Sequence, residues 1–101
     1  MNKNMIRQAQ QLQQKMAKIQ EELETATVEA SSGGGTVKVV VTGKQTIESI
    51  TIDPQCVDPE DVEVLEEMVM AAVNEGLQKA QELAAGKMSV ITGGLNIPGL
   101  G

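Results

Sequence analysis

Apolar residues near the N-terminus recur alternately four and three positions apart. They are Met5, Ala9, Leu12, Met16, Ile19, Leu23 and Ala26. A repeat of about 3.5 residues keeps such a stripe against a partner when the helix packs along a second helix. The glutamines and lysines between them are good helix formers. This heptad stripe therefore predicts a helix over residues 5–24 with another helix lying along it.

The charges of this helix are arranged against its own dipole. At about 100° per residue, its basic side chains fall within an arc of roughly 120° that is centred well away from the heptad stripe. These are Lys3, Arg7, Lys15 and Lys18. Acidic residues follow at Glu21, Glu22 and Glu24. Positive charge at the N-terminal end and negative charge at the C-terminal end both oppose the macrodipole, which indicates that these charges interact with something outside the helix.

The size and composition exclude several classes of protein. A chain of 101 residues forms one small domain with a limited core of its own, so dimerisation is expected. The chain has no Phe, Tyr, Trp or His and a single cysteine. Base stacking on aromatic rings, His-based nucleophile systems and the usual zinc sites are therefore excluded. We expect no catalytic residues, no metal site and no cofactor.

The net charge of −6 is unevenly distributed. Residues 1–20 carry four basic and no acidic side chains, whereas residues 21–101 carry four basic and fourteen acidic ones. A positive arm held away from an acidic body can still contact phosphates. The lone Cys56 cannot form an internal disulfide, and we see no signal peptide and no apolar run long enough to cross a membrane. A cytoplasmic location is expected.

Three strands are predicted after the first helix. Residues 26–32 form a short strand, and residues 36–42 alternate with Val37, Val39 and Val41 on one face. A third strand spans residues 46–53, where Ile50 and Ile52 share a face. Because Ile47 has the opposite parity, the third strand contains a bulge, belongs to a two-sided sheet, or starts after Ile47.

A second long helix is predicted after Pro54. Asp58 is its expected N-cap and Pro59 its first residue, and the helix is expected to end by Gly86. Small residues recur every four positions along it, at Ala72, Gly76, Ala80 and Ala84. Gly76 destabilises a helix by roughly 1 kcal/mol relative to alanine. Close packing or a kink would explain a glycine at this position. The alternative is a tolerated glycine on a solvated face.

This order of elements predicts an α+β fold. The expected elements are a long N-terminal helix, a three-stranded antiparallel meander and a long C-terminal helix. Residues 1–86 are expected to form a single domain, and residues 87–101 a Gly-rich tail whose Leu95, Ile97 and Leu100 could dock on it. In a homodimer, we expect the heptad stripe and the small-residue ridge to form the interface. Its predicted residues are Leu12, Met16, Ile19, Leu23, Ala72, Gly76 and Ala80.

Five segments, in order along nearly the whole chain, resemble the YbaB/EbfC family of bacterial nucleoid-associated proteins. They are MIRQAQQLQQKMAKIQEEL, SGGGTVKVVVTG, IESITIDP, DPEDVEVLEEMVMAAVNEGLQKA and TGGLNIPGL. The resemblance implies an intertwined, tweezer-like homodimer whose first helices project outward. It also implies a non-enzymatic protein of the nucleoid, involved in organising the bacterial chromosome, that binds duplex DNA with little sequence preference.

The predicted DNA-binding region is the first helix. Its candidate residues are Lys3, Arg7, Lys15 and Lys18, with Asn2 and Asn4 as neutral partners for phosphate. Contacts of this kind would bridge or bend DNA through its backbone. Such binding could also influence gene expression. The alternative for Lys15 and Lys18 is pairing with Glu21, Glu22 or Glu24, along the helix or across an antiparallel partner.

An alternative function is that of an acidic dimeric interaction module. Its stripe, its ridge or its tail would then recruit a replication or recombination protein, without direct DNA binding. A DNA titration distinguishes the two hypotheses.

Overall fold

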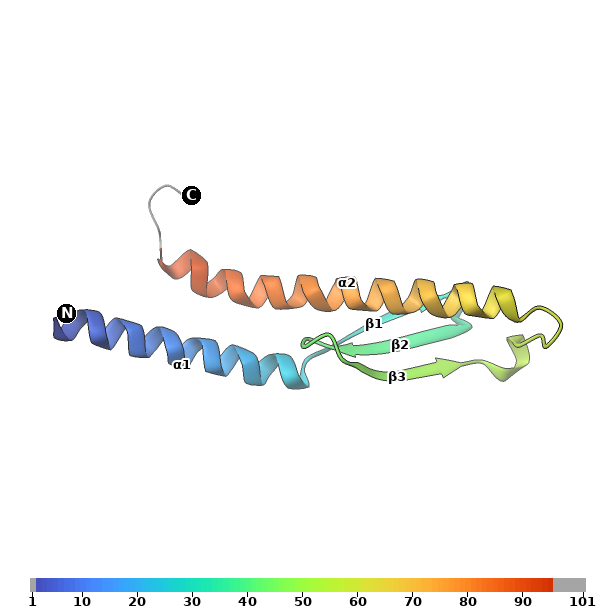
Figure 1. The fold of residues 1–101 in the computed structure, drawn as a ribbon, viewed down its shortest axis with the longest axis horizontal. Coiled ribbons are helices and arrows are strands. Elements are labelled where there is room, and N and C mark those ends of the chain that lie inside the picture. The colour runs from blue at the N-terminus through green and yellow to red at the C-terminus, as the bar shows by residue number, and fades with distance from the viewer. Residues whose placement is uncertain (1, 96–101) are drawn as a thin grey trace.

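The protein is an elongated α+β molecule (Figure 1). Its structure, a computed structural model, describes the backbone of residues 2–95 and the side chains of residues 2–91. The elements are α1 (Lys3–Thr25), β1 (Thr27–Ser32), β2 (Val37–Thr42), β3 (Ile47–Ile52) and α2 (Val62–Leu95). The radius of gyration is 19.5 Å, whereas a compact chain of this length would have about 13 Å. The predicted order of elements is confirmed.

Helix α1 begins and ends as its sequence suggests. Asn2 is the N-cap, and its Oδ1 accepts a hydrogen bond of 2.8 Å from the Met5 N–H. Ala26 ends the helix in an extended conformation, because the β-branched residues that follow favour a strand. No acidic residue lies in the first turn and no basic residue in the last. The charge order along α1 therefore opposes its dipole.

The sheet is an antiparallel meander of order β1-β2-β3. Val37, Val39 and Val41 are fully buried on one face, as their alternation predicts. Val40 pairs with Ser49 but Val41 pairs with Ile47, so the register shifts by one residue between these pairs. This irregularity is the bulge that was one of three explanations for the parity of Ile47.

Helix α2 lies on one face of the sheet, over β1 and β2 (Figure 1). Ala72 and Ala80 are fully buried in the core cluster with the three valines of β2. A β-carbon added to Gly76 would lie 2.8 Å from Val41 Cγ2 and 3.7 Å from Ala30 Cβ. The small-residue ridge thus allows the helix backbone to approach the sheet closely. Of the explanations offered for Gly76, close packing is therefore the one that the structure supports.

The bounds predicted for α2 are wrong at both ends. The helix begins at Val62, because Asp58 forms a separate turn in which its Oδ1 accepts from the Glu60 N–H at 2.9 Å. It continues through Gly86 to Leu95. The helix persists because Met88 and Ile91 pack on α1, and this contact outweighs the low helix propensity of glycine. Ile97 and Leu100 of the predicted tail lie outside the described residues.

The C-terminal part of α2 packs along α1. Ile19, Leu23 and Ile91 are buried there, and they form a second core cluster with Leu12, Leu83, Ala84 and Met88. The two helices run in opposite directions beyond the sheet (Figure 1). The neighbouring helix predicted by the heptad stripe is therefore present, and it is α2 of the same chain.

Candidate nucleic-acid interface

The N-terminal half of α1 is an exposed, basic arm. Every residue from 2 to 11 is exposed, including Lys3, Arg7 and Asn4. Asn2 uses its Oδ1 for the helix cap, which leaves its side-chain N–H groups as donors. These features give the arm several cationic and neutral donors, the chemistry that phosphate oxygens accept.

Lys15 and Lys18 lie farther along the same helix, and both are exposed. Within residues 2–91, neither side chain forms an ion pair, and the same is true of Lys3 and Arg7. The structure thus provides no pairing of Lys15 or Lys18 with an acidic residue of α1, the alternative considered from the sequence. All four cations are available to a ligand.

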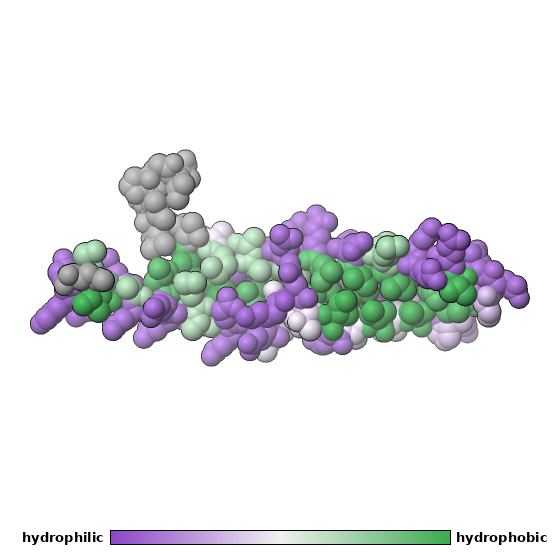
Figure 2. Space-filling model, viewed as in Figure 1, coloured by the Kyte–Doolittle hydropathy of each residue, from purple (hydrophilic) through white to green (hydrophobic). Residues whose placement is uncertain are grey.

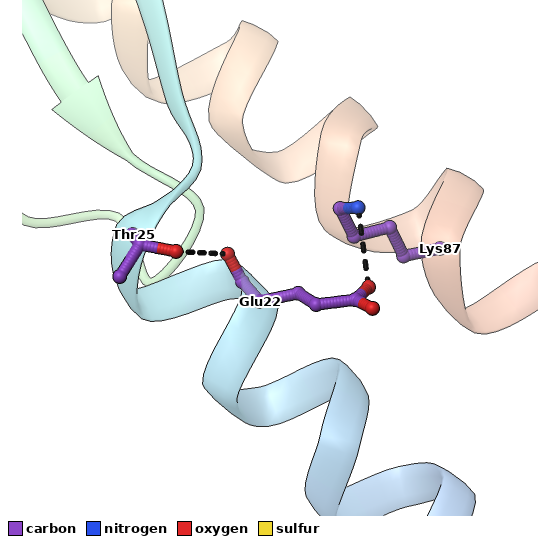
Figure 3. A network of polar contacts seen from close by, with 3 residues as sticks. All are labelled: Glu22, Thr25 and Lys87. Carbon is purple, nitrogen blue, oxygen red and sulfur yellow. Dashed lines mark hydrogen bonds and ion pairs between the residues drawn. The ribbon is translucent and has the colours of Figure 1, made fainter.

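Glu22 instead pairs with α2. Its Oε2 lies 3.3 Å from Lys87 Nζ, while its backbone carbonyl accepts from the Thr25 hydroxyl at 3.3 Å (Figure 3). The ion pair joins the end of α1 to the part of α2 that the sequence assigned to a tail. Lys87 is therefore a site residue that the sequence analysis missed. The signal was present, since Ala84, Met88 and Ile91 continue a helical apolar spacing past Gly86.

A groove lies between α1 and the C-terminal half of α2, beside the residues through which the two helices pack. Its volume is about 640 Å³. Its apolar lining comes from Leu12, Ile19, Val90 and Ile91. Its polar lining comes from Gln8, Gln11, Lys15, Lys18, Glu22 and Lys87. The groove has an apolar floor and a net charge of +2, so it favours an acidic ligand.

The residues predicted for the dimer interface differ in their exposure within the single chain. Ile19 and Leu23 are 9% and 3% exposed, because α2 of the same chain covers them. Ala72 and Ala80 are fully buried and Gly76 is buried, against the sheet. Within the single chain these residues are already covered, and their assignment to contact with a second chain stays a prediction. Leu12 is half-buried and lines the groove, whereas Met16 is 39% exposed and remains available.

Other apolar side chains remain uncovered. Met5 and Ile6 are exposed on α1, and Ile47 and Ile50 on β3, the edge strand that α2 does not cover. Figure 2 shows apolar surface along the middle of the molecule, over α2 and the sheet, and hydrophilic side chains at the end where α2 begins. Exposed apolar side chains that gather on one surface are typical of an interaction site.

The family model described as the YbaB/EbfC DNA-binding family matches residues 1–95 of the chain. The chain belongs to the YbaB/EbfC DNA-binding family. The basic arm, the groove and the ion pair between Glu22 and Lys87 all lie within the matched residues.

Individual members of the YbaB/EbfC family are similar over most of their length. A nucleoid-associated protein of Syntrophobacter fumaroxidans is 58% identical over 97 residues, which are 96% of this chain and 88% of that protein. A nucleoid-associated protein of Thermoanaerobacter pseudethanolicus is 57% identical over 97 residues, covering 96% and 87%. These names describe nucleoid-associated proteins and no enzymatic activity.

The fold also matches a solved structure. The crystal structure of an uncharacterized protein from Helicobacter pylori has a TM-score of 0.79 and 20% sequence identity. The match covers 91% of this chain and 98% of that one. It supports the α+β fold alone. Among the described residues, no helix has the length and apolar character needed to span a bilayer.

Proposed function

We propose that this protein is a non-enzymatic nucleoid-associated protein that binds duplex DNA through the phosphate backbone. The observation that carries the proposal is the row of four exposed cations on α1, none of which forms an ion pair within the described residues, in a chain of a DNA-binding family. Cations that are free of internal partners can release counterions from DNA when they meet phosphates.

The distribution of charge makes this binding compatible with a negative net charge. The molecule is 69 Å long, and the Debye length at physiological salt is about 8 Å. The basic arm lies at the opposite end from the acidic start of α2 (Figure 1). Screening therefore leaves the arm attractive to phosphate while the acidic end has little effect on it.

Little sequence preference is expected from the side chains available. The chain has no aromatic residue for base stacking. Lysines and an arginine on one exposed helix suit contacts with phosphates, which position a protein without reading bases. Binding through the backbone alone accounts for an interaction that is general along the chromosome.

A homodimer is part of the proposal. The chain exposes 7385 Å², whereas a compact monomer of this mass exposes about 5500 Å². The excess is about twice the roughly 800 Å² that each partner buries in a standard protein interface. We place the interface on the uncovered apolar side chains of the single chain. They are Ile47 and Ile50 on β3 and Met5, Ile6 and Met16 on α1.

A dimer with two basic arms would contact DNA at two places. Two separated contacts bridge two segments or bend one, and either geometry would suit a protein of the nucleoid. Its four cations per chain give at most eight phosphate contacts per dimer. The slope of log K against log salt would then reach at most about −7.

The test is a fluorescence anisotropy titration with random-sequence duplex DNA at two salt concentrations. Wild type should bind more weakly at the higher salt, and the fourfold variant Lys3→Glu, Arg7→Glu, Lys15→Glu and Lys18→Glu should lose binding while remaining folded by circular dichroism. Unlabelled duplexes of different sequence should compete equally. Unchanged binding by the folded variant would mean that the DNA-binding site does not include these four residues of α1.

A matched control separates location from net charge. The double variant Lys38→Glu and Lys44→Glu makes the same change in charge as Lys3→Glu and Arg7→Glu, but on the sheet and its hairpin. The sheet variant should bind DNA with nearly wild-type affinity, whereas the arm variant should not. Equal losses in the two variants would mean that net charge, and not the arm, governs binding.

A further inference from the structure

The groove between α1 and α2 is open and has no occupant from the described part of its own chain. Its lining includes Val90, which is 74% exposed, and Lys15 and Lys18, which have no ion-pair partners within residues 2–91. Its volume of about 640 Å³ lies within the range of ligand-binding clefts. A ligand for this groove needs apolar groups flanked by negative charge.

The other end of the same chain has this chemistry. The segment of residues 57–64, here called the acidic segment, joins the 3₁₀ turn Pro54–Cys56 to the start of α2. It carries four carboxylates and no basic residue, at Asp58, Glu60, Asp61 and Glu63. Its three valines, Val57, Val62 and Val64, are 37%, 47% and 47% exposed.

The groove cannot receive the acidic segment of its own chain. The groove lies where α1 runs beside α2, and the acidic segment lies at the opposite end of the 69 Å molecule (Figure 1). The complementary surfaces can therefore meet only between two copies. We propose that the groove between α1 and α2 binds the acidic segment of a second copy of this chain.

The geometry of this contact determines the kind of assembly. Because the two surfaces differ, the contact is heterologous, and each added copy leaves one free groove and one free acidic segment. Copies therefore associate head to tail into open chains. The contact is separate from the β3 and α1 surfaces assigned to the homodimer, and it does not require DNA.

The strength of the contact depends on salt. Lys15 and Lys18 are exposed, so their attraction to Glu60 and Glu63 of another copy is screened as ionic strength rises. The experiment is sedimentation velocity of the full chain without DNA, over a range of concentrations, at about 30 mM and about 500 mM salt. The weight-average mass at low salt and high concentration should be at least about twice its high-salt value, since open chains continue to grow.

Two variants reverse the charge of one surface each. Lys15→Glu with Lys18→Glu changes the net charge of the groove from +2 to −2, and Glu60→Lys, Asp61→Lys and Glu63→Lys together change that of the acidic segment from −4 to +2. Asp58 is retained because its side chain holds the turn before α2. Each variant alone should keep its high-salt mass at low salt, because its two surfaces then repel. An equal mixture should recover growth, since each reversed surface then meets its complement on the other variant.

Matched controls change the same charge elsewhere. Lys3→Glu with Arg7→Glu lies on α1 outside the groove, and the combined changes Glu24→Lys, Glu48→Lys and Glu82→Lys lie outside the acidic segment. Both should associate as wild type does. The proposal is overturned if wild type shows no salt-dependent growth, if the mixture of folded variants fails to recover growth, or if the controls lose growth equally.

The outcome is independent of DNA binding. The arm control, Lys3→Glu with Arg7→Glu, should lose DNA affinity while keeping self-association. The variant with the reversed acidic segment should lose self-association while keeping the cations of α1. Failure of one proposal is therefore distinguishable from failure of the other.

Discussion

Gly76 of α2 lies against Val41 of β2, so closely that a β-carbon on Gly76 would come 2.8 Å from Val41 Cγ2. Val41 is fully buried in the core cluster. In this fold, the closeness of helix and sheet depends on the absence of one side chain. The same relationship gives a quantitative prediction.

Gly76→Ala should lower the free energy of unfolding. Alanine favours a helix by about 1 kcal/mol over glycine, but overpacking a core costs about 1–3 kcal/mol. We expect a net loss of about 1 kcal/mol, measured by urea denaturation at fixed protein concentration. The matched control is Gly86→Ala in the same helix, where no atom lies within 4 Å of the added carbon. It should stabilise the protein, and equal effects at the two glycines would contradict the packing argument.

Leu23→Ala should be strongly destabilising. Leu23 is 3% exposed between α1 and α2, and truncation of a buried leucine costs about 2–5 kcal/mol. Met70→Ala is the comparison, because Met70 of α2 is 58% exposed and is not assigned to the homodimer interface. Denaturation of both variants measures the difference. A cost at Met70 as large as at Leu23 would contradict the argument that burial between α1 and α2 governs the loss at Leu23.

Ile50→Lys should weaken the proposed homodimer. Ile50 is 44% exposed on the edge strand β3, so a lysine there would cost little within one chain but would bury a charge in an interface. Light scattering at high salt should show a shift from dimer towards a monomer of 10.7 kDa. The matched control is Thr51→Lys, which is exposed on the opposite face of the same strand. Equal dissociation by both variants would argue against this face as the interface.

The ion pair between Glu22 and Lys87 should add little stability. Its side chains are 42% and 31% exposed, and ion pairs of this kind contribute about 0–1 kcal/mol. A double-mutant cycle with Glu22→Gln and Lys87→Met should give a coupling free energy below about 1 kcal/mol that falls with added salt. A larger coupling that persists at high salt would mean that the pair fixes the position of α1.

The salt dependence of DNA binding should follow the number of cations on α1. Each phosphate contact contributes about −0.9 to the slope of log K against log salt. Lys3→Gln with Arg7→Gln should make the slope shallower by about 1.8 per arm that binds. Anisotropy titrations over a range of salt concentrations measure both slopes. An unchanged slope would exclude Lys3 and Arg7 from the interface with phosphates.

The sequence by itself determined the local structure. A four-and-three spacing of apolar residues requires a neighbouring helix, and alternating valines require a strand with one buried face, whatever the rest of the chain does. The extended α1, the meander and the buried Val37, Val39 and Val41 followed from these periods. The row of cations on α1 was visible in the same way, since helical geometry alone places them on one side.

Only the tertiary structure decided which surfaces meet. The heptad stripe cannot specify whether its partner is another chain or another part of the same one, and here α2 covers Ile19 and Leu23. The position at which α2 ends also depends on tertiary packing. The packing of Ile91 on α1 outweighs the low helix propensity of Gly86. Spacing along one helix encodes a face, whereas the atoms that cover that face come from residues far away in the sequence.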